Sequence, residues 1–197
     1  TADFHAVQKQ IGRKAVVCGA SLGGRTALMA LGEGSQDLTT ALILVDIAPK
    51  TEAAGVARIQ QFMRANLDGF ANLEEAADAV SAYRHHRSRP KDVSGLKKNL
   101  RLKDDGRWYW HWDPKYLDRK DRNDPMHIDR VRIATPNIKV PTLLIRGGSS
   151  DVVSPEGVQD FLTLLPTAQF IDVADAGHMV AGDKNDIFTD AVVDFLG

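Results

Sequence analysis

A short glycine-rich segment, Gly19-Ala-Ser-Leu-Gly-Gly24, constrains the fold of this chain more than any other feature of its sequence. The apolar run Lys14-Ala-Val-Val-Cys18 precedes it and suits a strand that is buried on both faces. Residues 25–34 follow it with apolar side chains at helical spacing. The segment therefore has to turn the chain sharply from a buried strand into a helix, which is a unit of parallel α/β folds.

The alternation of strand and helix continues along the chain. Apolar runs predict further strands at 41–47, 141–145 and 168–173, and helical patterns follow at 156–165 and 187–196. Strands that alternate with helices predict a mainly parallel sheet with right-handed crossovers, so we expect the α/β class.

The long stretch between the second and third predicted strands has a different pattern. Helical periodicity is visible at 53–66, 73–86 and 93–102, and no strand of the main sheet is indicated. We interpret this stretch as a helical lid inserted over one end of the sheet. The expected organisation is a first core segment at 1–50, the lid insertion at 51–137 and a second core segment at 138–197.

Composition excludes several classes of protein. Hydrophobic residues make up 43% of the chain and charged residues 26%, which is ordinary for a globular domain, and no apolar run reaches the roughly 20 residues of a membrane span. The single cysteine, Cys18, excludes an internal disulfide and favours a reducing, cytoplasmic compartment.

The formal net charge is −1, although residues 81–122 hold 13 Lys and Arg against 6 Asp and Glu. We interpret this local excess as the solvated outer faces of the insertion. The alternative is a basic surface that attracts anionic substrates or nucleic acid, and no nucleic-acid motif supports it. We therefore expect neither nucleic acid nor a membrane as a partner.

The turn at 19–24 also carries the strongest chemical signal. The pattern G-x-S-x-G between a strand and a helix exposes the serine hydroxyl, so Ser21 is the candidate nucleophile. Small residues at Gly19 and Gly23 would let the two chain segments pass closely. The backbone N–H of Leu22, at the start of the helix, could stabilise a developing oxyanion.

A serine needs a base, and the base needs an acceptor that holds its tautomer. His178 is the candidate base, because of the six histidines it alone follows a predicted strand of the sheet on a glycine turn. Asp151 follows the strand at 141–145, at the same sheet edge, and is the expected acid. Asp46, at the end of the strand at 41–47, is the rival acid. No spacing typical of metal ligands is present, so we expect no metal and no cofactor.

The chain resembles α/β-hydrolase fold proteins of the lidded serine esterase and haloperoxidase-like group. The segment 19–24 resembles the nucleophile elbow of that family, 147–154 its acid loop and Asp175-Ala-Gly-His-Met-Val180 its histidine loop. Gly106-Arg-Trp-Tyr-Trp-His-Trp-Asp113 is similar to a lid segment. The resemblance implies hydrolysis of a carboxylic ester of a small or medium-sized substrate through an acyl-enzyme.

One departure from the family concerns the position of the nucleophile. In the family several strands precede the nucleophile, whereas here it is residue 21. We therefore expect that N-terminal strands of the fold, with the second oxyanion donor, belong to a segment outside this chain or to a separate chain. On that expectation, residues 1–197 alone would neither fold stably nor hydrolyse esters.

Other roles remain open at this point. A cofactor-free haloperoxidase or perhydrolase and a carbon–carbon bond hydrolase could use the same triad, and a non-catalytic ligand-binding homologue is the alternative from another class. Candidate pocket residues are Trp108, Trp110, Trp112 and Met179, although filling the core of the lid is the favoured role for the tryptophans.

Overall fold

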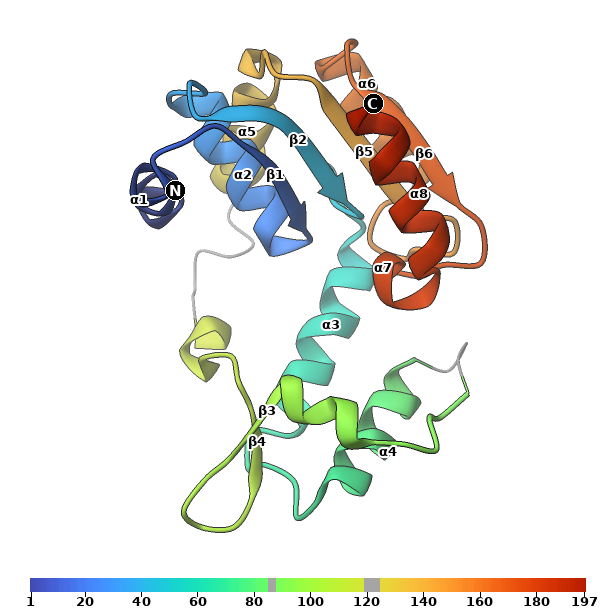
Figure 1. Ribbon diagram of the computed structural model, residues 1–197. Helices are drawn as coiled ribbons and strands as arrows, with labels where there is room; N and C mark the ends of the chain where they lie inside the picture. The colour runs from blue at the N-terminus through green and yellow to red at the C-terminus, as the bar shows by residue number, and fades with distance from the viewer. Residues whose placement is uncertain (85–87, 119–124) are drawn as a thin grey trace. The chain divides into compact units, whose positions relative to one another are not determined.

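The computed structural model describes residues 1–84, 88–118 and 125–197, with the backbone alone at 125–128. The chain forms two compact units, the first made of residues 1–56 and 121–197 and the second of residues 57–120 (Figure 1). The first unit holds the sheet, and the second is the insertion.

The sheet of the first unit is parallel throughout. Its four strands are β1 (Ala15–Ala20), β2 (Thr39–Val45), β5 (Thr142–Gly147) and β6 (Gln169–Val173), and they lie side by side in the order β1-β2-β5-β6. The registers align the carboxyl ends of neighbouring strands, with Ala20 opposite Val45 and Val45 opposite Ile145. The four strands expected from the sequence are confirmed, and so is the mainly parallel α/β fold.

Both faces of the central strands are buried, which explains their continuous apolar runs. On one face Ile43 and Val45 form a core with residues of β5, against which Phe188 and Phe195 pack. These two aromatic residues belong to α8 (Asn185–Leu196), which lies along the sheet in Figure 1. The residues of β2 that point the other way, Leu42 and Leu44, are fully buried too.

The helices of the first unit begin and end where local chemistry favours it. Ser154 accepts a hydrogen bond from the N–H of Gly157 and Pro155 stands at the first position of α6, both features of helix starts. Gly12, with φ of 66°, ends the first helix as expected from the sequence. The other helices here are α1 (Ala2–Ile11), α2 (Leu22–Glu33), α5 (Pro125–Ala134), η3 (Thr135–Asn137), α6 (Pro155–Leu164) and α7 (Val180–Asp183).

The insertion is narrower than the sequence predicts, at 57–120 instead of 51–137. The helix α5 belongs to the first unit because it packs on α2. A Cβ at Gly32 would lie only 2.2 Å from the carbonyl oxygen of Ala134, and the amide of Asn137 donates to the carbonyl of Gly32. Arg130 on α5 also pairs with Glu33 on α2.

The second unit has a small core of its own. Phe70, Ala76 and Leu100 are almost fully buried, and Trp108 and Trp110 pack against them. The elements here are α3 (Ala53–Ala65), which begins in the first unit, α4 (Leu73–Tyr83), η1 (Ser94–Lys98), β3 (Leu100–Leu102), β4 (Trp108–Trp110) and η2 (Pro114–Asp118).

Two predicted helices of the insertion differ from the structure. The helix expected at 93–102 is instead the short 3-10 turn η1 followed by β3, because Leu100 and Leu102 pair with Trp110 and Trp108 of β4. The helix expected at 73–86 is α4, which ends at Tyr83, and residues 85–87 lie outside the described residues.

In the part of the chain that the structure describes, none of the helices combines the length and the apolar composition that crossing a membrane requires.

Candidate active site

Ser21 is the only residue between the end of β1 and the start of α2. Its backbone has φ of 47° and ψ of −117°, a conformation that residues other than glycine rarely adopt. Its N–H donates to the carbonyl of Val45 at 3.1 Å, so the neighbouring strand holds the turn. The sharp strand-to-helix turn expected from the sequence is present, and it is tighter than the six-residue segment suggested.

The close approach at this turn involves Gly19 and Gly24. A Cβ at Gly19 would lie 2.6 Å from the backbone nitrogen of Gly24, and a Cβ at Gly24 would lie 2.4 Å from Cγ2 of Ile47. A Cβ at Gly23 would meet nothing within 4 Å. The expectation that Gly23 relieves a clash is therefore wrong, and Gly24 has that role because it faces β1 and the end of β2.

Asp46 directly follows β2 and is completely buried. Its N–H donates to the carbonyl of Ile145 at 2.7 Å, and its φ of 48° turns the chain away from the sheet. The carboxylate accepts three hydrogen bonds. The N–H of Gly147 donates to Oδ1 at 3.0 Å, the hydroxyl of Ser150 donates to Oδ2 at 2.5 Å, and Nδ1 of His178 lies 2.7 Å from Oδ2.

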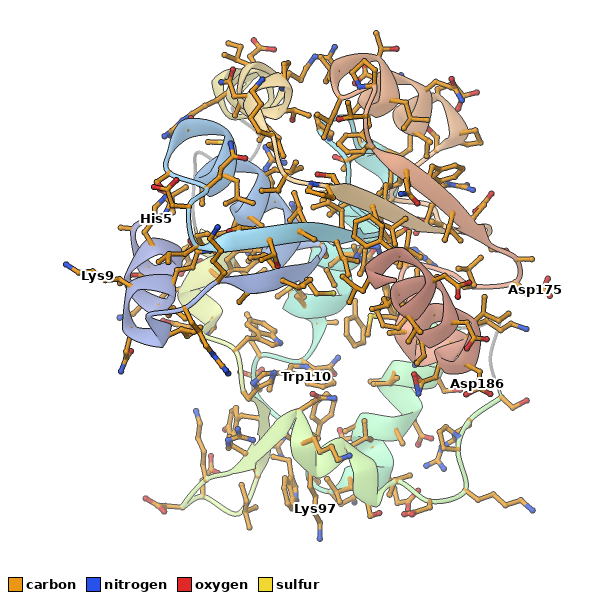
Figure 2. All side chains as sticks on the ribbon, turned by 45° about the horizontal axis from the view of Figure 1, so that its top comes forward. His5, Lys9, Lys97, Trp110, Asp175 and Asp186 are labelled. Carbon is orange, nitrogen blue, oxygen red and sulfur yellow. The ribbon has the colours of Figure 1, made fainter. Side chains whose placement is uncertain are left out.

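His178 lies between this carboxylate and Ser21. Its Nε2 is 3.1 Å from Oγ of Ser21 while Nδ1 faces Asp46, and only 10% of the side chain is exposed. The residue comes from the loop after β6, on which Figure 2 labels Asp175. In the tautomer with its proton on Nδ1, the imidazole donates to the buried carboxylate, and Nε2 is free to accept the serine proton.

Backbone contacts fix the loop that carries His178. The N–H of Ser149 donates to the carbonyl of Ala176 at 2.8 Å, and the N–H of Gly177 donates to a carboxylate oxygen of Asp183 at 3.0 Å. A Cβ at Gly147 would lie 2.2 Å from the carbonyl oxygen of Gly177, so the loops after β5 and β6 touch.

The expectation that Asp151 contacts His178 is wrong, because the structure brings the rival candidate, Asp46, to Nδ1 of His178. The loop after β5 directs Ser150 toward Asp46, and Asp151 is half-buried. The backbone of Asp151 faces the start of α3, since a Cβ at Gly55 would lie 2.0 Å from its carbonyl oxygen. An aspartate that follows an apolar strand without any intervening residue is the sequence signal for Asp46.

Ser150 is a residue of this site that the sequence analysis does not single out. Besides donating to Asp46, its Oγ accepts hydrogen bonds from the N–H groups of Val152 and Val153, at 3.1 and 3.2 Å. Nothing in the sequence separates it from its neighbours Ser149 and Ser154, because all three are small polar residues of one loop.

The other candidate residues occupy different surroundings. Leu22 is the first residue of α2, where backbone N–H groups have no acceptor within the helix, and its side chain is half exposed. Met179 follows His178 and is 52% exposed. Trp108 and Trp110 pack within the second unit, in which Figure 2 labels Trp110. The ring centroids of Trp110 and Phe70 are 5.3 Å apart. Trp112, in the same unit, is half-buried.

Among the described residues, no three His, Cys, Asp or Glu side chains are gathered so that they could hold a metal ion.

Comparison with known proteins gives consistent matches. A family model described as the alpha/beta hydrolase family matches residues 1–191. The mouse sn-1-specific diacylglycerol lipase ABHD11 is 27% identical over an alignment of 211 residues, gaps included, which covers 98% of this chain and 63% of the mouse protein. The esterase YbfF of Escherichia coli strain K12 is 29% identical over 188 residues, which cover 93% of this chain and 67% of the esterase.

Among solved structures, that of E-2-(acetamidomethylene)succinate hydrolase superposes with a TM-score of 0.86 at 19% identity, over 99% of this chain and 71% of the hydrolase. A likeness at 19% sequence identity shows that the two proteins share a fold. The chain spans less than two thirds of the length of the mouse lipase.

Proposed function

The chain belongs to the alpha/beta hydrolase family, and on that premise we propose that it hydrolyses a carboxylic ester with Ser21 as nucleophile, His178 as base and Asp46 as acid. The observation that carries the proposal is the unbroken chain of polar contacts from Oγ of Ser21 through the imidazole to the buried carboxylate. Nucleophile, base and orienting acid in this geometry are what acyl transfer to a serine requires.

In the first half of the reaction, Oγ of Ser21 attacks the ester carbonyl while Nε2 of His178 takes its proton. The imidazolium that forms is stabilised by the carboxylate of Asp46. The protonated Nε2 then gives its proton to the leaving alcohol, and an acyl-serine remains. In the second half, water repeats the same steps and releases the carboxylic acid.

The negative charge on the carbonyl oxygen develops beside the start of α2. The N–H of Leu22 is available there, and the helix N-terminus adds a partial positive charge. The strained turn at Ser21 supports this role, because it holds Oγ at the tip of the turn and the N–H of the next residue near it.

The relatives and the side chains beside the site support the proposed substrate class. Two relatives are an esterase and a diacylglycerol lipase, which both cleave carboxylic esters. Leu22 and Met179, which flank Ser21 and His178 in the sequence, are half exposed and apolar. An ester with an apolar acyl or alcohol group suits these neighbours.

The experiment that tests the proposal combines Ser21→Ala with a fluorophosphonate probe. We expect the substitution to lower hydrolysis of p-nitrophenyl esters by about 10⁴-fold or more, since the members of a triad act as a unit. The probe should label the parent protein at Ser21 and leave the variant unlabelled. A variant that keeps a tenth of the parent activity would contradict the assignment of the nucleophile. Tight binding of an ester without labelling or turnover would instead favour a ligand-binding role.

A further inference from the structure

A buried guanidinium lies beneath the loop that follows β5. Arg146 is the last residue but one of β5, and only 6% of its surface is exposed. Removing a charged group from water is costly unless partners replace the water. Nη1 of Arg146 lies 3.0 Å from each carboxylate oxygen of Asp172 on β6, so the charge is paired.

The remaining nitrogens of Arg146 bind the two ends of the loop. Nε donates to the carbonyl of Val153 at 2.7 Å, and Nη2 donates to the carbonyl of Gly148 at 3.4 Å. The guanidinium therefore bridges the first and last residues of the segment 148–153 from inside the protein. A planar group with donors in a fixed fork can hold both carbonyls and a carboxylate at once, and an ammonium group cannot.

Two groups within reach of this bridge determine where the carboxylate of Asp46 lies. Ser150, in the middle of the bridged segment, donates to Oδ2, the same oxygen that faces Nδ1 of His178. Gly147, at the start of the loop, donates its N–H to Oδ1. The hydroxyl of Ser150 is in turn fixed by the N–H of Val153, whose carbonyl Arg146 holds.

We propose that Arg146 is a positioning residue for the proposed acid: by bridging Gly148 and Val153 it holds Ser150 and Gly147 against Asp46, and thereby sets the contact between Asp46 and His178. The inference rests on the proposed function. A purely structural role, in which Arg146 only ties β5 to β6 through Asp172, would affect stability and leave turnover per folded molecule unchanged.

The test uses Arg146→Lys with Arg132→Lys as the matched control. Arg132 also pairs with an aspartate of the first unit, Asp160, which lies on α6 and not in the loop after β5. We expect Arg146→Lys to lower kcat by about tenfold, with KM changed less than about threefold, because one hydrogen bond to a charged group is worth roughly that factor. Arg132→Lys should leave kcat within about twofold of the parent. Active sites are counted by fluorophosphonate titration, so that unfolded protein is excluded.

A double-mutant cycle with Ser150→Ala separates positioning from stability. If Arg146 acts through Ser150, Arg146→Lys should lower kcat by less than about threefold in the Ser150→Ala background, because coupled residues are not additive. The same tenfold loss in both backgrounds, or a parent-like kcat for Arg146→Lys, would overturn the proposal.

A second variant and a proton resonance test the same role of Arg146 independently of Arg146→Lys kinetics. Asp172→Asn, at a half-exposed position, loosens the guanidinium without removing it and should lower kcat in the same direction if Arg146→Lys does not fold. The low-field proton resonance of Nδ1–H of His178 should move in both variants, whether or not an ester is turned over. If Ser21→Ala leaves activity intact, the proposed function fails. If it abolishes activity but neither the resonance nor kcat responds to Arg146, only this inference fails.

Discussion

The carboxyl ends of β2 and β5 each lead into an aspartate at the same edge of the sheet, yet only one of them contacts His178. Asp46 follows β2 at once, and its carboxylate is fully buried and accepts three hydrogen bonds. Asp151 comes four residues after the end of β5, in a loop, and is half-buried. On the proposed function, the acid is therefore distinguished by the hydrogen-bond donors around its buried carboxylate rather than by resemblance to an acid loop.

The two strand ends also cooperate. A carboxylate buried without partners would be strongly disfavoured, and charge-assisted hydrogen bonds to backbone N–H and hydroxyl groups offset that cost. Gly147 and Ser150, from the end of β5, provide these donors for Asp46. The loop after β5 therefore contributes to the site through its donors, while β2 contributes the charge.

The largest expected effect comes from removing the charge at each strand end in turn. Asp46→Asn should lower kcat for ester hydrolysis by about 10³–10⁴-fold, since an amide cannot stabilise the imidazolium or hold the productive tautomer. Asp151→Asn should change kcat by less than about threefold. Both variants are measured by steady-state kinetics on the same p-nitrophenyl ester, with active sites titrated.

An equal loss in the two variants would break the distinction between the strand ends. A large loss in Asp151→Asn alone would return the role of acid to the loop after β5, as the sequence resemblance implies.

Much of the core of this site could be predicted from sequence, because local chemistry determined it. Ser21 follows from a glycine-rich turn between an apolar strand and a helix, and His178 from a glycine turn after the last strand; the structure brings both together. The choice between Asp46 and Asp151 depends on the burial of Asp46 and on its positive φ, and neither quantity can be obtained from a motif.

The insertion was harder to predict for a related reason. Its short strands β3 and β4 are only three residues each and are stabilised by packing of Phe70 and Leu100 against Trp108 and Trp110. Periodicity over so few residues cannot separate a helical turn from a strand. The alternation of Trp108, Trp110 and Trp112 with other residues is a signal for β4, whereas Leu100-Arg-Leu102 alternates over only the three residues of β3.

A smaller effect, on stability, tests how the end of β2 is held against the turn at Ser21. Gly24→Ala places a methyl group 2.4 Å from Cγ2 of Ile47, the residue after Asp46, and 2.6 Å from the carbonyl oxygen of Gly19. We expect it to lower the free energy of unfolding by about 3 kcal/mol, at the upper end of ordinary overpacking, because one of these neighbours is backbone. Urea denaturation followed by far-ultraviolet circular dichroism measures the change, because the first unit holds the four-stranded sheet and the helices around it.

Gly23→Ala is the matched control, since the added methyl group meets nothing within 4 Å and alanine favours a helix over glycine. Its free energy of unfolding should stay within about 1 kcal/mol of the parent or rise slightly. Equal destabilisation by the two substitutions would show that the turn does not pack on the end of β2 through Gly24.

The smallest expected effect comes from moving the charge from one strand end to the other. Oγ of Ser150 and Nδ1 of His178 both contact Oδ2 of Asp46, so a carboxylate at position 150 would lie near the imidazole. In the double variant Asp46→Asn with Ser150→Asp, the amide at position 46 can donate to the new carboxylate. We expect this variant to regain about tenfold in kcat over Asp46→Asn, which is roughly the contribution of one hydrogen bond to a charged group.

The control variant combines Asp46→Asn with Ser149→Asp, at an exposed neighbouring position, and should regain no activity. Ser150→Asp alone should be less active than the parent, because two carboxylates at such a distance repel and one of them takes up a proton. Recovery by both double variants would mean that any negative charge on the loop is sufficient, whereas recovery by neither would mean that His178 can use a carboxylate only at the end of β2.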